Sequence, residues 1–125
     1  MARHPQITDA EWELMKALWE TPGSTASEVL ERVPRDWHLK TVRTLLDRLQ
    51  KKGVLSASSE RPCRYFPLVT REECIDEASS SFLEKVFDGA LTPLVAHFVK
   101  QSPISQKDKA ELERILEKYK RKEKP

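Results

Sequence analysis

The residues most suited to chemistry gather in the segment 39–52, where long basic side chains and threonine hydroxyls recur at helical spacing. Side chains three or four positions apart share one face of a helix. One line of this face holds Lys40, Thr44, Asp47 and Lys51. Such groups suit phosphate oxygens and the hydrogen-bonding edges of bases, so the segment favours a nucleic-acid contact. A solvated face without a ligand is the alternative that this pattern alone leaves open.

Basic residues are concentrated around this segment, although the whole chain of 125 residues carries a net charge of only +2. Between positions 32 and 64 there are nine basic residues and three acidic ones. From Arg71 onward eleven basic residues balance eleven acidic ones. A local positive field attracts phosphates even where the net charge is small. The two parts are therefore expected to have different tasks, with nucleic-acid binding in the first.

Other chemistries find little support in the sequence. The two cysteines, Cys63 and Cys74, form no C-x-x-C motif, and His4, His38 and His97 show no repeated ligand spacing. We therefore expect free thiols, no metal site and no cofactor. A nucleophile with a base, paired carboxylates or a phosphate-binding glycine loop does not occur in recognisable spacing, so the chain is not expected to be an enzyme.

Two capping boxes precede the basic segment and predict the helices that must position it. Thr8 with Glu11, and Thr25 with Glu28, have the residue types and the spacing of this motif. The hydroxyl accepts a hydrogen bond from a free backbone N–H, and the glutamate reaches back to the cap residue. Helices are therefore expected to begin at both sites, and proline or glycine after each marks its end.

The third helix is expected over 39–52, before Gly53, because one side of this segment is apolar. The apolar stripe consists of Leu39, Val42, Leu45, Leu46 and Leu49. The segments 54–58 and 63–69 have strand composition and enclose turn residues, which predicts a β-hairpin. Helix, helix, basic helix and hairpin is the order of a winged helix-turn-helix. The segment 39–52 is then the recognition helix, and the hairpin is the wing.

The predicted contacts to double-stranded DNA come from the recognition helix and the wing. They are Lys40, Thr41, Arg43, Thr44, Arg48, Lys51, Arg61 and Arg64. Phosphate contacts that set the register are expected from Arg43, Lys51 and Lys52 and from the wing. Lys40, Thr41 and Thr44 are expected near base edges. Cys63 also lies in the wing, where a redox role is the alternative to an inert thiol.

The C-terminal half is predicted to form three helices, over 71–87, from Thr92–Pro93 and from Ser105. Short amphipathic helices are seldom stable without a partner surface. This arm is too short to bury its own apolar side chains, so a second copy is expected to cover them. The residues expected in this homodimer interface are Phe82, Val86, Phe87, Leu91, Leu94, Phe98, Leu112, Ile115 and Leu116. A two-fold dimer also matches a palindromic DNA site.

The expected fold class is mainly α with a small β-hairpin wing. We expect a winged helix-turn-helix DNA-binding domain over residues 1–70 and a helical dimerisation domain over residues 71–125. No apolar run approaches the roughly 20 residues that span a membrane, and the first five residues lack a signal-peptide core. These observations predict no membrane insertion and a cytoplasmic location.

Four blocks of the sequence, in order, resemble the penicillinase and methicillin-resistance repressor family. The blocks are ITDAEWELM (7–15), KTVRTLLDRLQKKG (40–53), YFPL (65–68) and SFLEKVFDG (81–89). The resemblance extends from Ile7 to about Leu116. It implies a dimeric winged-helix transcriptional repressor that binds palindromic operators with TACA/TGTA-type half-sites and controls resistance or stress genes.

The resemblance also implies a mode of regulation. In that family derepression often follows cleavage of the repressor, triggered by a membrane-bound sensor protease, and the segment 94–98 aligns with the cleaved region. The resistance repressors have Asn-Phe there and this chain has His97-Phe98, which is the possible cleavage site. A second departure is His38, where a serine-like N-cap is expected. The C-x-C cysteine pair of copper-responsive relatives is absent from the sequence.

One alternative comes from a different class of protein. A winged helix can serve as a protein-interaction module, in which the basic third helix would dock an acidic partner without sequence-specific DNA binding. Selectivity for an operator over random duplex separates the two hypotheses.

Overall fold

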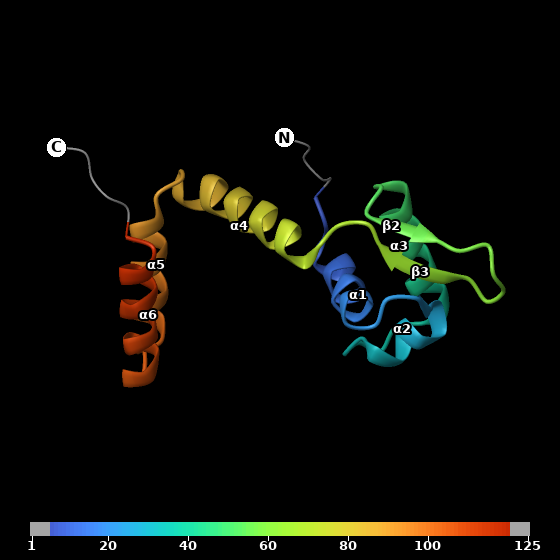
Figure 1. Cartoon of the computed structure of the whole chain (residues 1–125), viewed down its shortest axis with the longest axis horizontal. Coiled ribbons are helices and arrows are strands. Elements are labelled where there is room, and N and C mark those ends of the chain that lie inside the picture. Colours follow the sequence, from blue (N-terminus) through green and yellow to red (C-terminus); the bar gives the residue numbers. More distant parts are fainter. Residues whose placement is uncertain (1–5, 121–125) are drawn as a thin grey trace. The chain divides into compact units, whose positions relative to one another are not determined.

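The structure, a computed structural model, describes residues 6–120 of the chain (Figure 1). Its elements are, in order, α1 (Asp9–Glu20), β1 (Ser24–Thr25), α2 (Ala26–Arg32), α3 (Leu39–Lys51), β2 (Leu55–Ala57), β3 (Arg64–Pro67), α4 (Arg71–Phe87), α5 (Leu91–Gln101) and α6 (Gln106–Lys118). This order confirms the predicted fold class, mainly α with a small β wing. His4, which was considered as a metal ligand, lies outside the described residues.

Both predicted capping boxes are present. The Thr8 hydroxyl accepts from the Glu11 N–H at 3.2 Å, and the Thr8 N–H donates to Glu11 Oε1 at 2.9 Å. The Thr25 hydroxyl and the Glu28 side chain make the same pair of bonds at 3.2 and 2.8 Å. Each box occupies two backbone N–H donors that the start of the helix would otherwise leave unpaired, so α1 and α2 start where the sequence predicts.

The sheet has one strand more than the sequence predicts. The strands β2 and β3 form the expected antiparallel hairpin, and β1 pairs antiparallel with the other edge of β3, so the order is β1-β3-β2. Ser24 lies opposite Tyr65, and Thr25 lies opposite Arg64. A two-residue strand has no alternation that a sequence pattern could detect, and these residues also belong to the second capping box. The additional strand ties the wing to the start of α2.

The hydrophobic core lies between the first three helices and the sheet. Its fully buried members include Leu14, Leu18, Val29, Leu46 and Val54. All five apolar positions predicted for the third helix contact this core, and only Leu39 among them is partly exposed. At the edge of the core, the rings of Trp12 and Trp19 meet edge to face at 5.5 Å, and the Trp19 indole donates to the Val69 carbonyl at 2.9 Å. Both tryptophans therefore have structural roles.

The C-terminal helices begin close to the predicted sites, with one correction. Helix α4 starts at Arg71, and Ser105 caps α6 by accepting from the Asp108 N–H at 3.0 Å. Helix α5, however, starts at Leu91 with Ala90 as its N-cap, so the predicted start at Thr92–Pro93, with Thr92 as the cap, was wrong. Proline fits anywhere in the first helical turn, because those N–H groups have no partner within the helix. Its presence therefore did not fix which residue is first.

The chain divides into two compact units between Ser81 and Phe82, within α4. The first turn of α4 belongs to the N-terminal unit, because the Cys74 side chain is buried in its core. The predicted division into a DNA-binding domain over residues 1–70 and a dimerisation domain over residues 71–125 stays a prediction. Among the described residues, no helix is long and apolar enough to cross a membrane.

Candidate nucleic-acid interface

Helix α3 separates its apolar and polar side chains cleanly. Val42, Leu46 and Leu49 are fully buried, and they fix the rotation of the helix about its axis. All six residues predicted for DNA contact on this helix are exposed: Lys40, Thr41, Arg43, Thr44, Arg48 and Lys51. Four of them, Lys40, Thr41, Thr44 and Arg48, line one shallow hollow. The burial of one face thus presents the other to solvent as a continuous hydrogen-bonding surface.

The exposed face of α3 keeps most of its positive charge available. Within residues 6–120, Lys40, Arg43 and Arg48 form no ion pair, while Lys51 lies 3.2 Å from Asp47 one turn earlier on the same helix. An exposed pair of this kind is weak and exchanges readily for another anion. The Thr44 hydroxyl donates to the Lys40 carbonyl at 3.0 Å, so it can face a ligand only as an acceptor or through its methyl group.

The wing is the hairpin of β2 and β3, whose loop projects beyond the ends of the strands (Figure 1). The Ser58 N–H donates to the Arg64 carbonyl at 2.8 Å, and the Arg64 N–H donates to the Ser58 hydroxyl at 2.9 Å. The Cys63 thiol donates to the Ser58 carbonyl at 3.1 Å. Arg61 is exposed in this loop. Its guanidinium is therefore accessible to a phosphate.

Arg64 differs from the other predicted DNA contacts. Its guanidinium donates to the Gly23 carbonyl at 2.8 Å and lies 3.8 Å from Glu28 and 3.7 Å from Glu60. The side chain is 41% exposed. Arg64 is thus held by neighbouring groups of the protein, and a phosphate contact from it stays a prediction.

Lys52, which the sequence counts among the basic residues, is also engaged within the protein. Its ammonium donates to Glu11 Oε1 at 2.5 Å and to the Gln6 carbonyl at 2.8 Å. Glu11 is only 1% exposed. Burial raises the pKa of this carboxyl, but the hydrogen bonds from Lys52 and from the Thr8 cap together bring it below its usual value. The pair joins the start of α1 to the C-terminal end of α3.

Sequence reasoning missed both internal partnerships, Glu11 with Lys52 and Glu28 with Arg64. In each, the glutamate of a capping box also meets a cation from the DNA-facing part of the fold. The capping boxes themselves were visible in the sequence. The cations that they attract were not, because about forty residues separate the partners and no local spacing connects them.

The two cysteines have different surroundings. Burial raises the pKa of the Cys74 thiol, and the carboxylates of Glu73 and Glu77 act in the same direction. A buried thiol with a raised pKa is a poor nucleophile. Cys63 is partly exposed next to Tyr65, whose pKa is raised by burial and by this thiol. A redox role for Cys63 stays an untested alternative.

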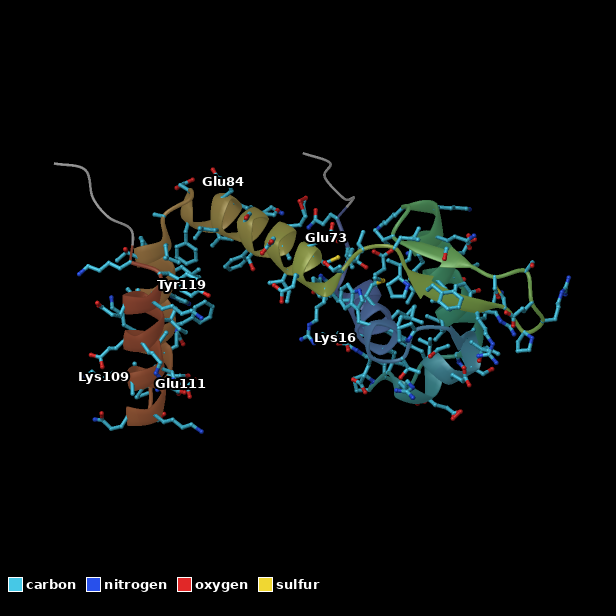
Figure 2. The ribbon with its side chains drawn as sticks, in the orientation of Figure 1. Lys16, Glu73, Glu84, Lys109, Glu111 and Tyr119 are labelled. Atoms are coloured by element: carbon cyan, nitrogen blue, oxygen red, sulfur yellow. The ribbon has the colours of Figure 1, made fainter. Side chains whose placement is uncertain are left out.

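The C-terminal unit contains no buried residue among positions 82–120. Of the predicted interface residues, only Phe87 and Leu94 are half-buried, and the others are exposed: Phe82, Val86, Leu91, Phe98, Leu112, Ile115 and Leu116. Tyr119, directly after α6, is 71% exposed and is labelled in Figure 2 together with Lys109 and Glu111 of that helix. Large apolar side chains therefore lie in water throughout this unit.

The possible cleavage site lies inside α5. His97 and Phe98 are both exposed, and Phe98 retains 56% of its accessible surface. Their rings meet edge to face at 5.5 Å, and the Phe87 ring lies 6.4 Å from His97. The bond between the two residues is helical, so it is not in the extended form that a protease cleft accepts.

Comparison with known proteins identifies relatives of this chain. The family model described as penicillinase repressor matches residues 7–118. The chain is 35% identical over 116 residues to the methicillin resistance regulatory protein MecI of Mammaliicoccus sciuri, covering 90% of this chain and 94% of that protein. It is also 35% identical over 127 residues to the penicillinase repressor of Bacillus licheniformis, covering 99% of both.

The fold matches a solved relative as well. The solution structure of the Bacillus licheniformis BlaI monomeric form in complex with the blaP half-operator has a TM-score of 0.51 to this chain and 37% sequence identity. The match covers 58% of this chain and 93% of that one.

Proposed function

Because the chain belongs to the penicillinase repressor family, whose members are transcriptional repressors, we propose that it represses transcription by binding operator DNA through α3 and the wing. The observation that carries the proposal is the exposed basic face of α3, whose opposite face is locked in the core. The solved relative that is similar to this chain binds its half-operator. The members of this family are repressors and not enzymes.

The exposed residues divide by the chemistry of their side chains. Arg43, Lys51 and Arg61 carry full charges on flexible stems and are assigned to phosphates, which position the protein along the duplex. Lys40, Thr41 and Thr44 lie in the N-terminal half of α3, line one shallow hollow and are assigned to base edges. Because the Thr44 hydroxyl donates its proton to the backbone carbonyl of Lys40, Thr44 is suited to accept a hydrogen bond from a base amine or to contact a thymine methyl.

The repressor acts as a homodimer in this proposal. A unit whose helices bury no side chain cannot be stable by itself, because most helical stability comes from packing an apolar face. A second copy supplies a surface of matching chemistry and aligns two recognition helices on a palindromic site. Sedimentation should show a dimer at micromolar concentration. Leu112→Glu with Ile115→Glu should shift it to monomer without unfolding α1 to α3.

The proposal also includes relief of repression through cleavage by a sensor protease. Cleavage between His97 and Phe98 requires α5 to unwind locally, and this helix has neither a buried residue nor a side-chain cap at Ala90. Cleavage would detach the C-terminal part of the arm, which contains the predicted interface residues Leu112, Ile115 and Leu116. An immunoblot during induction tests this. An intact chain throughout derepression would exclude cleavage as the switch.

The experiment that tests DNA binding is selection from a random duplex pool at physiological salt, followed by sequencing. We expect an enriched palindrome with two half-sites, bound about 10³-fold or more tighter than random duplex. No enrichment would overturn the proposal and favour a module that docks an acidic protein. A transcriptional repressor that binds operator DNA is expected to act in the cytoplasm.

A further inference from the structure

Arg64 joins three parts of the N-terminal unit through one side chain. It lies in β3, directly after the wing loop, and its guanidinium donates to the Gly23 carbonyl at 2.8 Å. Gly23 belongs to the turn between α1 and β1, and its own N–H donates to the Tyr65 carbonyl at 2.8 Å. The turn is thus bound to β3 by its carbonyl and by its amide.

The second contact of Arg64 is the capping box of α2. Glu28 Oε1 accepts from the Thr25 N–H at 2.8 Å and lies 3.8 Å from the Arg64 guanidinium. The Thr25 hydrogen bond and then the charge of Arg64 lower the pKa of Glu28. The carboxylate therefore stays charged at neutral pH and serves the helix start and the arginine together. Glu60, in the wing loop, lies 3.7 Å from the Nε atom on the other side.

This arrangement uses the planar fork of arginine. The guanidinium presents N–H groups in fixed directions, so it can face a carbonyl and two carboxylates that lie on different elements. A lysine ammonium carries the same charge, but its three N–H groups share one nitrogen atom, so it cannot meet groups that face Nη1 and Nε of the guanidinium separately. The contacts made by Arg64 depend on its shape more than on its charge.

We propose that Arg64 is a positioning residue that fixes the wing to the α1–β1 turn and to the start of α2, and thereby places Arg61 for its phosphate contact. The inference rests on the proposed DNA binding, which it deepens. Arg61 is exposed in the loop, and the bonds among Ser58, Cys63 and the Arg64 backbone lie within the hairpin itself. The hairpin also meets the helical body through the β1 pairing, the Gly23 N–H bond to the Tyr65 carbonyl and the buried Leu55. The Arg64 side chain adds a polar link from the hairpin to the turn and to α2 at once.

The test compares lysine substitutions at the two wing arginines, with operator affinity as the readout. Arg61→Lys should retain most of the affinity, because a phosphate accepts either cation. Arg64→Lys should weaken operator binding roughly fivefold or more, because the fork is lost although the charge remains. Arg71→Lys, at an exposed position in the first turn of α4, is the matched control and should bind like the parent protein.

A double-mutant cycle sharpens the test. Arg61→Ala should cost affinity in the parent protein and nearly nothing in the Arg64→Lys background, because a misplaced wing no longer delivers Arg61 to DNA. Wild-type affinity for Arg64→Lys, or full additivity of the two changes, would overturn the proposal and assign Arg64 to a phosphate.

A measurement without DNA separates this proposal from the proposed function. Amide chemical shifts and hydrogen exchange of the free protein should change at Gly23 and across the loop 58–63 in Arg64→Lys, but not in Arg61→Lys. Unchanged wing amides would refute the positioning role whether or not the protein binds an operator. Changed amides together with an absence of operator binding by the parent protein would reject only the repressor function.

Discussion

The two units of this chain are both helical, yet they bury their apolar residues in opposite ways. In the N-terminal unit Leu14, Leu18 and Leu46 are completely buried, and the capping-box carboxylates bind cations from other elements. In the C-terminal unit no described residue is buried, and Leu116 retains 69% of its surface. Amphipathic sequence is present in both. The difference is whether the same chain supplies the surface that covers the apolar face. The stability of the C-terminal unit is therefore expected to depend on protein concentration.

The largest effect should come from the same substitution made once in each unit. Leu46→Ala removes a fully buried side chain, so it should lower the free energy of unfolding by about 2–5 kcal/mol. Leu116→Ala should leave the unfolding of the N-terminal unit unchanged and weaken dimerisation instead. Denaturant unfolding at low and high protein concentration measures both. Equal losses at high dilution would show that the C-terminal unit has its own core.

Removal of the Lys52 ammonium should have the next largest effect. Lys52→Met leaves the Glu11 carboxylate buried without its cation, and we expect a loss of about 2–3 kcal/mol, since Lys52 is partly exposed. Lys51→Met, at the adjacent exposed pair with Asp47, is the control and should change stability by less than about 1 kcal/mol. Similar losses for the two variants would mean that the Glu11 pair contributes little.

The Glu11 pair also predicts a pH dependence. Its folded-state pKa lies below the usual value of 4.5, so its contribution to stability is complete above that pH. The contribution is lost as the pH falls through the lowered folded pKa, because the unfolded chain takes up the proton first. Glu11→Gln should reduce the slope of stability against pH in this acid range by at most about 1.4 kcal/mol per pH unit.

The smallest predicted effect is a gain at the start of the recognition helix. His38 has the extended backbone of an N-cap, φ −82° and ψ 155°, but its side chain makes no capping bond. His38→Ser should supply that bond and raise the free energy of unfolding by about 0.5–1 kcal/mol. Thermal unfolding measures the change. A neutral or destabilising result would mean that serine makes no capping bond at this position or that the imidazole stabilises the fold by another contact.

Much of the fold follows from local patterns in the sequence. The capping boxes at Thr8 and Thr25 predicted the starts of α1 and α2, and the apolar stripe with Gly53 predicted α3, because these signals act within one or two helical turns. The same stripe predicted which residues of α3 are exposed. The start of α5 was misplaced because Pro93 is compatible with several positions in the first turn.

The sequence by itself determined the order of the helices and the hairpin, the basic face of α3 and the family. Only the tertiary structure decided which cations of the basic segment are available. It engages Lys52 with Glu11 and Arg64 with Gly23 and Glu28, and it leaves Arg43 and Arg48 exposed. The physical reason is that helix periodicity fixes which face a residue occupies, whereas an ion pair or a short strand such as β1 depends on where distant segments meet after folding.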